Sequence, residues 1–337
     1  MNFSAFPALQ SSQQKNIFLY IGKLLTGTTL AAVAVWCVGV ARFVWHFSTV
    51  ETVLFAVSLA VVWTASCFFC RAWWMLAVIE GMILLSFLLL TPERRFASER
   101  WSVECRRVPE LKFLPDGKVA ISNIRNFRYR TAEDFDIRYK NDVFDPEKLA
   151  SLDIALSYWY KVDLVAHMLL CFNFRDGRKL AVSFEPRVPD GKKGGSFFLG
   201  IYRQYGRMML FAAPEDIFDL RSRYRGETLY SYRCAVNGAE LKNIFLHIAG
   251  QAEEIMHKNG FYHSITDNCT TGFREALRHS ARLEEFDLRW IFNGLFDRYL
   301  FEKGFLERRN GESFGSLKSR SFVPGLCSGT ESKHNIY

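Results

Sequence analysis

A cysteine within a turn-rich stretch is the residue of this chain best suited to covalent chemistry. Residues 262–277 read YHSITDNCTTGFREAL, so Cys269 follows Asp267 and Asn268 and precedes a segment of helical character. Asp, Asn, Ser and Thr favour helix N-caps, because their side-chain oxygens accept the first free backbone N–H groups. The pattern predicts Cys269 at or just before a helix N-terminus, where the helix dipole lowers a thiol pKa. The alternative is a buried structural cysteine.

His167 is the best candidate for the base that a thiol nucleophile requires. It lies in the first of two strand-like runs, residues 162–174 and 179–187, which flank an Asp-Gly turn and predict a β-hairpin. A two-residue loop mixes polar and apolar residues on both faces. A three-residue loop with Gly177 in the left-handed conformation gives one apolar face and places His167 opposite Glu185. The apolar face then contains Ala166, Met168, Leu170, Phe172, Phe174, Leu180, Val182, Phe184 and Pro186.

These residues can be assembled into a catalytic set in the chain order His, Glu, Cys. Glu185 beside His167 would hold one ring nitrogen and fix its tautomer, as the third member of a triad does. Asn268 and the backbone N–H of Cys269 would stabilise an oxyanion. The supporting hydroxyls expected around this set are those of Ser183 and Thr270.

Two alternatives stand beside this assignment of the base. The first is that His167 is an ordinary strand histidine whose hydrogen bonds are satisfied and which has no catalytic role. His263 is a rival base, but it lies only six residues before Cys269 and suits a loop position better.

Three arginines alternate with other residues in the segment 216–233, which reads DIFDLRSRYRGETLYSYR. Arg221, Arg223 and Arg225 are suited to clamping a phosphate or a carboxylate, because guanidinium groups donate two parallel hydrogen bonds. The alternative is a solvated strand edge. We carry Arg221 and Arg225 forward as candidate substrate-binding residues.

The N-terminal quarter of the chain is strongly apolar. The segments Ile17–Val40, Thr52–Phe69 and Ala72–Leu90 are each near the roughly 20 residues that a helix needs to cross a bilayer. We therefore expect three transmembrane helices, with two spans and an interfacial piece as the alternative. The expected divisions are a tail at 1–16, a transmembrane region at 17–92, a catalytic domain at 93–310 and a flexible tail at 311–337.

The charge of the chain suggests a partner. The formal net charge is +8, and a basic domain beside a membrane most simply meets anionic lipid headgroups. No nucleic-acid motif is present, so nucleic acid is not expected. The arginines after the third apolar segment would place the domain in the cytoplasm by the positive-inside rule.

The eight cysteines show no zinc-site spacing, and we expect no metal or cofactor. A disulfide among Cys105, Cys171, Cys234 and Cys327 stays open.

Four blocks of sequence resemble the bacterial Lnb-type family, which is named for a lipoprotein N-acyltransferase and its N-terminal periplasmic domain. The blocks are HMLLCFNFRDGRKLAVSFEPR, DLRSRYRGETLYSYR, YHSITDNCTTGFREAL and GLFDRYLFEKGFL, and they cover roughly residues 100–306. The resemblance implies an α+β domain with a permuted papain-like fold, similar to lecithin retinol acyltransferase. It implies acyl transfer by Cys269 and His167, with Glu185 and Arg187 matching the family's SxExR block and Arg187 in contact with substrate.

The resemblance also implies a bacterial inner-membrane protein whose large domain is periplasmic, against the charge count. Two departures bear on substrate: the segment 188–195 lacks the family's glutamate, and the apolar segments precede the domain instead of following it. The leading hypothesis is a membrane-anchored cysteine acyltransferase that takes an acyl group from a phospholipid or lipoprotein. The alternatives are a thiol peptidase or amidase on cell-envelope peptides, and a binding module without catalysis. Membrane lipids and lipoproteins are the expected partners.

Overall fold

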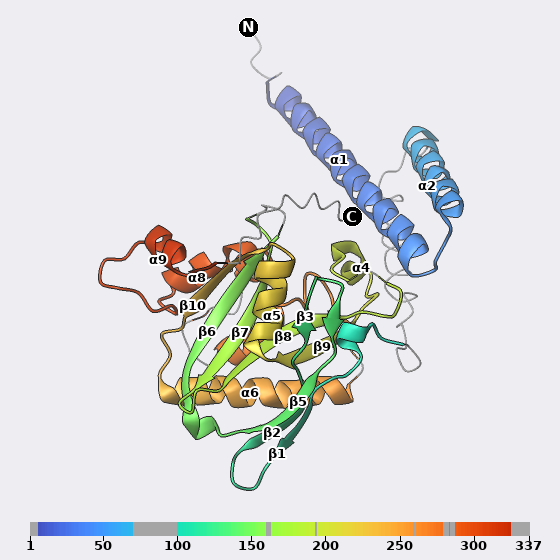
Figure 1. Ribbon diagram of the computed structural model, residues 1–337. Helices are drawn as coiled ribbons and strands as arrows, with labels where there is room; N and C mark the ends of the chain where they lie inside the picture. The colour runs from blue at the N-terminus through green and yellow to red at the C-terminus, as the bar shows by residue number, and fades with distance from the viewer. Residues whose placement is uncertain are drawn as a thin grey trace. The chain divides into compact units, whose positions relative to one another are not determined.

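The chain divides into two units, residues 1–94 and residues 95–337. The computed structural model describes residues 6–69, 100–159, 163–192, 194–258, 260–278, 283 and 287–324, and each unit is considered on its own. The larger unit is an α+β domain built on a mixed sheet (Figure 1).

The first unit contains two helices in contact with each other, α1 (Phe6–Phe43) and α2 (Thr49–Phe69). They include the first two apolar segments, while the third lies outside the described residues. Within the described part of the chain, no helix combines the length and apolar character that crossing a membrane requires. The predictions of N-terminal transmembrane helices and of a multi-pass inner-membrane protein are therefore corrected. Polar positions interrupt both helices: α1 includes Lys23, and α2 has Glu51 in its first turn.

The sheet of the second unit positions most of the residues discussed below. Its strands follow the order β1-β2-β9-β8-β7-β6-β10-β11, with β5 also paired to β2. Neighbours are antiparallel except β2 and β9, which are parallel. The strands are β1 (Glu110–Phe113), β2 (Val119–Arg125), β5 (Tyr139–Phe144), β6 (Leu149–Tyr158), β7 (Ala166–Phe174), β8 (Lys179–Arg187), β9 (Gly206–Ala212), β10 (Thr228–Arg233) and β11 (Phe322–Val323), and a separate pair is β3 (Arg128–Tyr129) with β4 (Phe135–Asp136).

The predicted hairpin is confirmed in β7 and β8, with the predicted register. The pairs run from Asn173–Lys179 to Leu169–Ser183, and the same register continued by two residues sets His167 opposite Glu185. Gly177 has a φ of 84°, the left-handed conformation that the three-residue loop requires. The predicted apolar face, apart from Pro186, lies in the main hydrophobic core.

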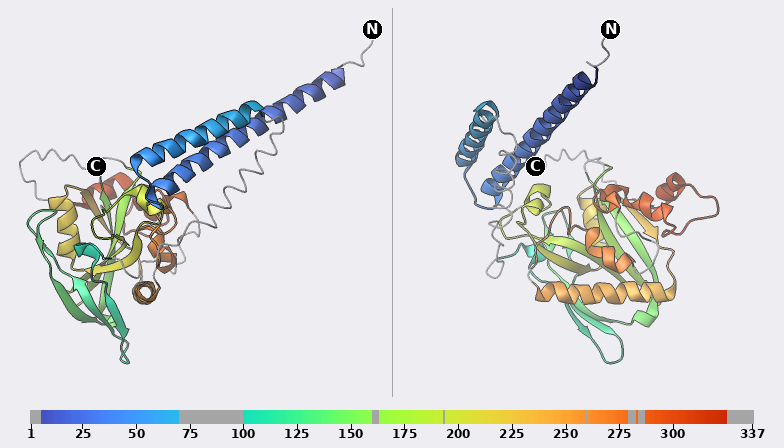
Figure 2. Two further views of the ribbon diagram at one scale, coloured as in Figure 1. Left: turned by 90° about the vertical axis from the view of Figure 1, so that its right-hand side faces the viewer. Right: turned by 180° about the vertical axis from the view of Figure 1, so that it is seen from behind.

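One long helix covers the apolar face of the sheet. Helix α6 (Gly238–His257) lies across this face (Figures 1 and 2). Its start is fixed by a capping box, in which the Asn237 side chain accepts from Glu240 N–H and the Glu240 carboxylate accepts from Asn237 N–H. Its apolar residues recur at helical spacing and are buried in the main core: Leu241, Ile244, Phe245, Ile248, Ala249, Ala252 and Ile255.

Helix α4 (Phe197–Ile201) precedes β9. One segment differs from what the sequence suggested. The polar C-terminal stretch was expected to be a flexible tail, yet α9 (Phe314–Arg320) buries Leu317 and β11 pairs with β10. The remaining described helices are α5 (Pro214–Asp219), α7 (Arg274–Arg278) and α8 (Phe296–Glu302), with shorter turns η2 (Val103–Cys105), η3 (Pro146–Lys148), η4 (Leu220–Tyr224), η5 (Thr271–Phe273), η6 (Leu288–Trp290) and η7 (Asn293–Leu295).

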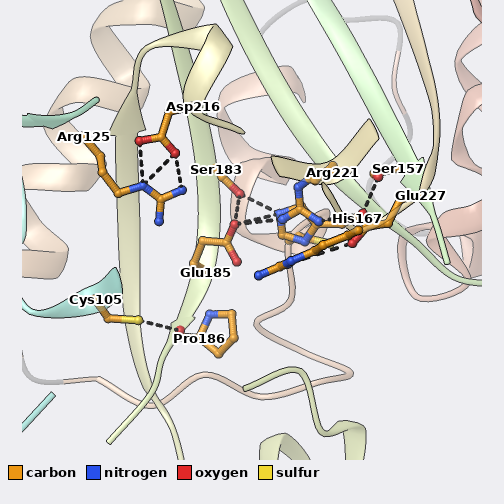
Figure 3. A network of polar contacts seen from close by, with 12 residues as sticks. Cys105, Arg125, Ser157, His167, Ser183, Glu185, Pro186, Asp216, Arg221 and Glu227 are labelled. Carbon is orange, nitrogen blue, oxygen red and sulfur yellow. Dashed lines mark hydrogen bonds and ion pairs between the residues drawn. The ribbon is translucent and has the colours of Figure 1, made fainter. Parts of the chain in front are cut away.

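A buried ion pair anchors α5 to the sheet. Asp216 is fully buried and accepts hydrogen bonds from Arg125 Nε and Nη2 at 3.1 and 2.8 Å and from Phe127 N–H at 2.6 Å (Figure 3). Helix α5 leads directly into η4, a π-helical turn that contains Arg221. The Arg125–Asp216 ion pair therefore fixes the start of the α5–η4 segment, which positions Arg221.

We expect Asp216→Ala to destabilise the domain by about 3–5 kcal/mol, because it leaves the Arg125 guanidinium buried without its counter-charge. Urea denaturation followed by circular dichroism measures the loss. Asp134→Ala is the matched control: Asp134 also takes two hydrogen bonds from one arginine, Arg130, but both side chains are more than half exposed. An equal fall in the midpoint for the two variants would contradict this account of the ion pair.

Candidate functional site

Three polar side chains from the β7–β8 hairpin meet at one point of the sheet (Figure 3). His167 Nε2 lies 2.7 Å from Ser183 Oγ and 3.0 Å from Glu185 Oε1, and Ser183 Oγ donates to Glu185 Oε1 at 2.8 Å. They share a face of the hairpin because alternate residues of a strand point the same way. The predicted contact between His167 and Glu185 is present in the structure.

The hydrogen bonds assign the proton on the imidazole. The single hydroxyl hydrogen of Ser183 goes to Glu185, so Ser183 Oγ acts as an acceptor toward His167. Nε2 of His167 therefore bears the hydrogen, which it shares between Ser183 and Glu185. Nδ1 is then the ring nitrogen that can exchange a proton with the thiol.

The Cys269 thiol is buried in the main core, only 3% exposed, with polar atoms close to its sulfur. Its Sγ is 3.2 Å from Asn293 Nδ2, 3.7 Å from the Ala166 carbonyl oxygen and 3.9 Å from Thr270 Oγ1. Burial alone would raise the pKa of Cys269, but the charge of His167 and its hydrogen bond to the sulfur bring that pKa below the ordinary value. The prediction of a thiol beside an imidazole therefore agrees with the structure.

His167 and Glu185 each stabilise the charged form of the other. Burial and Arg221 both lower the pKa of His167, yet Glu185 and Cys269 raise it to about 9. Burial would raise the pKa of Glu185, but His167, Arg221 and Ser183 hold it well below its usual range. At neutral pH the carboxylate is charged and the imidazole favours its protonated form, so the arrangement stabilises a thiolate–imidazolium pair.

Arg221 connects this cluster to a second carboxylate. Its Nη2 donates to Glu185 Oε1 at 3.3 Å and its Nη1 to Glu227 Oε2 at 3.1 Å, and Ser157 Oγ also donates to Glu227. Arg221 is only 7% exposed. The sequence suggested that Arg221 binds substrate, and this stays a prediction; in the structure its guanidinium pairs with Glu185 and Glu227.

Other candidates from the sequence have different surroundings. Asn268 Oδ1 accepts from the backbone N–H groups of Thr270 and Thr271 at 2.9 Å each, and its Nδ2 donates to the Ser264 carbonyl. Its amide is therefore used to shape the turn before η5, in the manner of an N-cap. The rival base His263 accepts at Nδ1 from Thr266 N–H within the same loop, which is the loop role considered for it.

The remaining two arginine candidates do not join the cluster. Arg187 donates to the carbonyl oxygens of Cys105 and Arg106 at 3.1 Å each, and its guanidinium stacks over the Trp101 ring. Arg225 is half-exposed, and its Nη1 lies 3.9 Å from Glu227 Oε1. Nothing in these contacts assigns either residue to a substrate.

The other described cysteines of the domain differ from Cys269. Cys105, Cys171 and Cys234 are free thiols, so the disulfide that the sequence left open is not formed among these three, and Cys327 lies outside the described residues. Burial raises the pKa of each, to about 12 for Cys171. In the described part of the chain, no group of His, Cys, Asp and Glu side chains is arranged to hold a metal ion.

Asn293 and Glu227 are the two members of this site that the sequence analysis missed. Asn293 lies 24 residues after Cys269, on η7, in an aromatic-rich stretch. The Asn-Gly pair within that stretch indicates a turn but does not point to Cys269. Glu227 lies within the segment 216–233, in which only the arginines were considered as candidates.

Residues 136–295 match the family described as the Lnb N-terminal periplasmic domain. No curated protein and no solved structure was found to match the chain, so the papain-like fold implied by the resemblance stays a prediction. The matched range includes Cys269, His167, Glu185, Arg221 and Asn293. The resemblance seen in the sequence blocks is confirmed over residues 136–295 by this match to the Lnb N-terminal periplasmic domain family.

Proposed function

We propose that this domain is a cysteine acyltransferase that forms a thioester at Cys269. The observation that carries the proposal is the buried cluster in which His167, held by Glu185, lowers the pKa of the Cys269 thiol. A purely structural cysteine needs no ionisable partner, and the neighbouring thiols of Cys171 and Cys234 have pKa values raised by burial. Family membership supports a periplasmic location for the domain.

The chemistry follows from the proton assignment. The Cys269 thiolate attacks the carbonyl carbon of an acyl ester, and a C–S bond forms as the C–O bond breaks. The His167 imidazolium gives its proton to the departing alcohol oxygen. An amine or water then attacks the thioester, His167 takes a proton from it, and the thiolate is regenerated. Glu185 stabilises the imidazolium in both half-reactions.

Apolar side chains beside the cluster favour an acyl donor. Leu164 and Val165 immediately precede β7 and are 50% and 41% exposed, and Phe292, next to Asn293, is 46% exposed. The two segments touch, because Gly294 N–H donates to the Leu164 carbonyl. Exposed apolar residues grouped next to a nucleophile suit the hydrocarbon of a phospholipid or lipoprotein acyl group. This is why we rank an acyltransferase above a thiol peptidase or amidase with the same catalytic residues.

Because Cys269 is only 3% exposed, an ester reaches the sulfur only after neighbouring side chains move. Such closed geometry is common in sites that tighten around a substrate. It excludes water from the ion pair, which strengthens the interactions on which the thiolate depends.

We expect a long-chain p-nitrophenyl ester to acylate the wild-type chain at Cys269 and to release one equivalent of nitrophenolate. The adduct should be sensitive to hydroxylamine, which cleaves thioesters. Cys269→Ala should abolish the burst, whereas Cys171→Ala, the matched change of a buried thiol on β7, should retain it. A burst that survives in Cys269→Ala would overturn the assignment of the nucleophile.

The pKa of about 9 for His167 gives the acylation rate a basic limb. The rate should rise as pH passes the lowered pKa of Cys269, because the thiolate forms. It should fall as pH rises through about 9, because the imidazolium loses the proton that the leaving group needs. An ester with an aliphatic alcohol as leaving group needs this proton, so acylation of Cys269 by such an ester between pH 5 and 10.5, followed by mass spectrometry of quenched samples, measures both limbs. His167→Gln should lower the rate about 10²–10⁴-fold and remove the basic limb; a basic limb that persists would contradict the role of His167.

Glu185→Gln should move the basic limb to lower pH, because the carboxylate charge that raises the pKa of His167 is lost. Glu254→Gln is the control, since Glu254 is an exposed carboxylate that pairs with Lys258 on α6. If the limb stays in place in Glu185→Gln, then Glu185 does not set the charge of the imidazole.

A further inference from the structure

The side chain of Asn293 is held in one orientation against the sulfur of Cys269. Asn293 Oδ1 accepts from the backbone N–H of Ala166 at 2.9 Å, and Nδ2 approaches Cys269 Sγ at 3.2 Å. The amide cannot be reversed, because its oxygen must face the N–H donor. Asn293 is only 6% exposed, so its Nδ2 donor faces the Cys269 sulfur with little access to solvent.

The backbone around Asn293 is fixed just as firmly. Gly294 N–H donates to the Leu164 carbonyl at 3.1 Å, and the Tyr158 hydroxyl donates to the Gly294 carbonyl at 2.8 Å. A Cβ at position 294 would lie 2.2 Å from the Asp163 carbonyl oxygen, so only glycine allows η7 to approach the start of β7 this closely. The Asp297 carboxylate also holds this segment in place, because it accepts hydrogen bonds from the hydroxyls of Tyr158 and Tyr232.

We propose that Asn293 is the side-chain donor of the oxyanion hole, an inference that rests on the proposed acyl transfer. When Sγ bonds to the carbonyl carbon, the negative charge moves to an oxygen two bonds from the sulfur. A preorganised donor already within hydrogen-bonding distance of Sγ is placed to receive that charge. The amide of Asn268, which the sequence suggested for this role, is occupied by the turn before η5.

Two reactions of the same sulfur separate this role from a structural one. Acylation by the long-chain p-nitrophenyl ester passes through an oxyanion, whereas alkylation by iodoacetamide at a saturated carbon does not. A change that only distorts Cys269 or disfavours its thiolate slows both reactions alike. The ratio of the acylation rate constant to the alkylation rate constant therefore reports the oxyanion donor specifically.

The variants are Asn293→Asp and Asn293→Ala, measured in the full chain. Asn293→Asp keeps an oxygen for the Ala166 N–H and nearly the same shape but lacks the donor, so it protects the test if the alanine variant folds poorly. Thermal unfolding by circular dichroism checks the fold of each. Asn173→Ala is the control, because Asn173, on β7, also uses its side-chain amide for hydrogen bonds within the domain, to Ser151 and Asp153.

We expect the acylation-to-alkylation ratio to fall about 10²–10³-fold in both Asn293 variants and to stay within about threefold of wild type in Asn173→Ala. If both rate constants fall together in the Asn293 variants, so that the ratio is unchanged, the oxyanion role is overturned while the nucleophile stands. If the wild-type chain is alkylated but never acylated, the proposed function fails, and the role of Asn293 fails with it.

Discussion

The contact between the Glu185 carboxylate and the His167 imidazole is the interaction on which the rest of the site depends. Both groups are withdrawn from water, and a buried charge is costly unless an opposite charge and hydrogen bonds accompany it. Each therefore favours the charged form of the other. Ser183 completes the pair by donating to the carboxylate and accepting from the ring, so a single tautomer of the imidazole satisfies all three side chains.

Transfer of a proton from Cys269 to His167 leaves the net charge of this cluster unchanged, because the proton stays within it. What decides the position of the proton is the field of the fixed charges nearby. Glu185 favours the imidazolium, and Arg221 opposes it. Arg221 also pairs with Glu227, which draws part of its charge away from the imidazole. The second carboxylate thus moderates the opposing effect of the arginine that holds Glu185 in place.

The sequence was informative where a pattern is local. Alternation of apolar residues and one Asp-Gly turn were enough to predict the register of β7 and β8, and with it the contact between His167 and Glu185. The turn residues before Cys269 predicted a cap, although the cap uses the Asn268 amide that had been assigned to the oxyanion.

Long-range contacts were not predictable in this way. Asn293 reaches Cys269 from a segment whose composition resembles ordinary core, and its partner Ala166 is 127 residues away. Composition also misled: the apolar helices α1 and α2 read as membrane spans, and the polar stretch that forms α9 and β11 read as a flexible tail. In α9 a single buried residue, Leu317, and a two-residue strand pairing outweigh the polar composition.

In the proposed acyl transfer, burial of the thiol would couple substrate entry to catalysis. The exposed Phe292 is adjacent to Asn293, and Leu164 is hydrogen bonded through its carbonyl to Gly294. An acyl chain that packs on these apolar residues therefore presses on the same short segment that holds the Asn293 amide against the sulfur. Binding energy from the hydrocarbon, which is remote from the reacting carbon, would then help to align the Asn293 amide as negative charge develops on the oxygen. A short ester lacks this binding energy and would therefore lose rate as well as affinity.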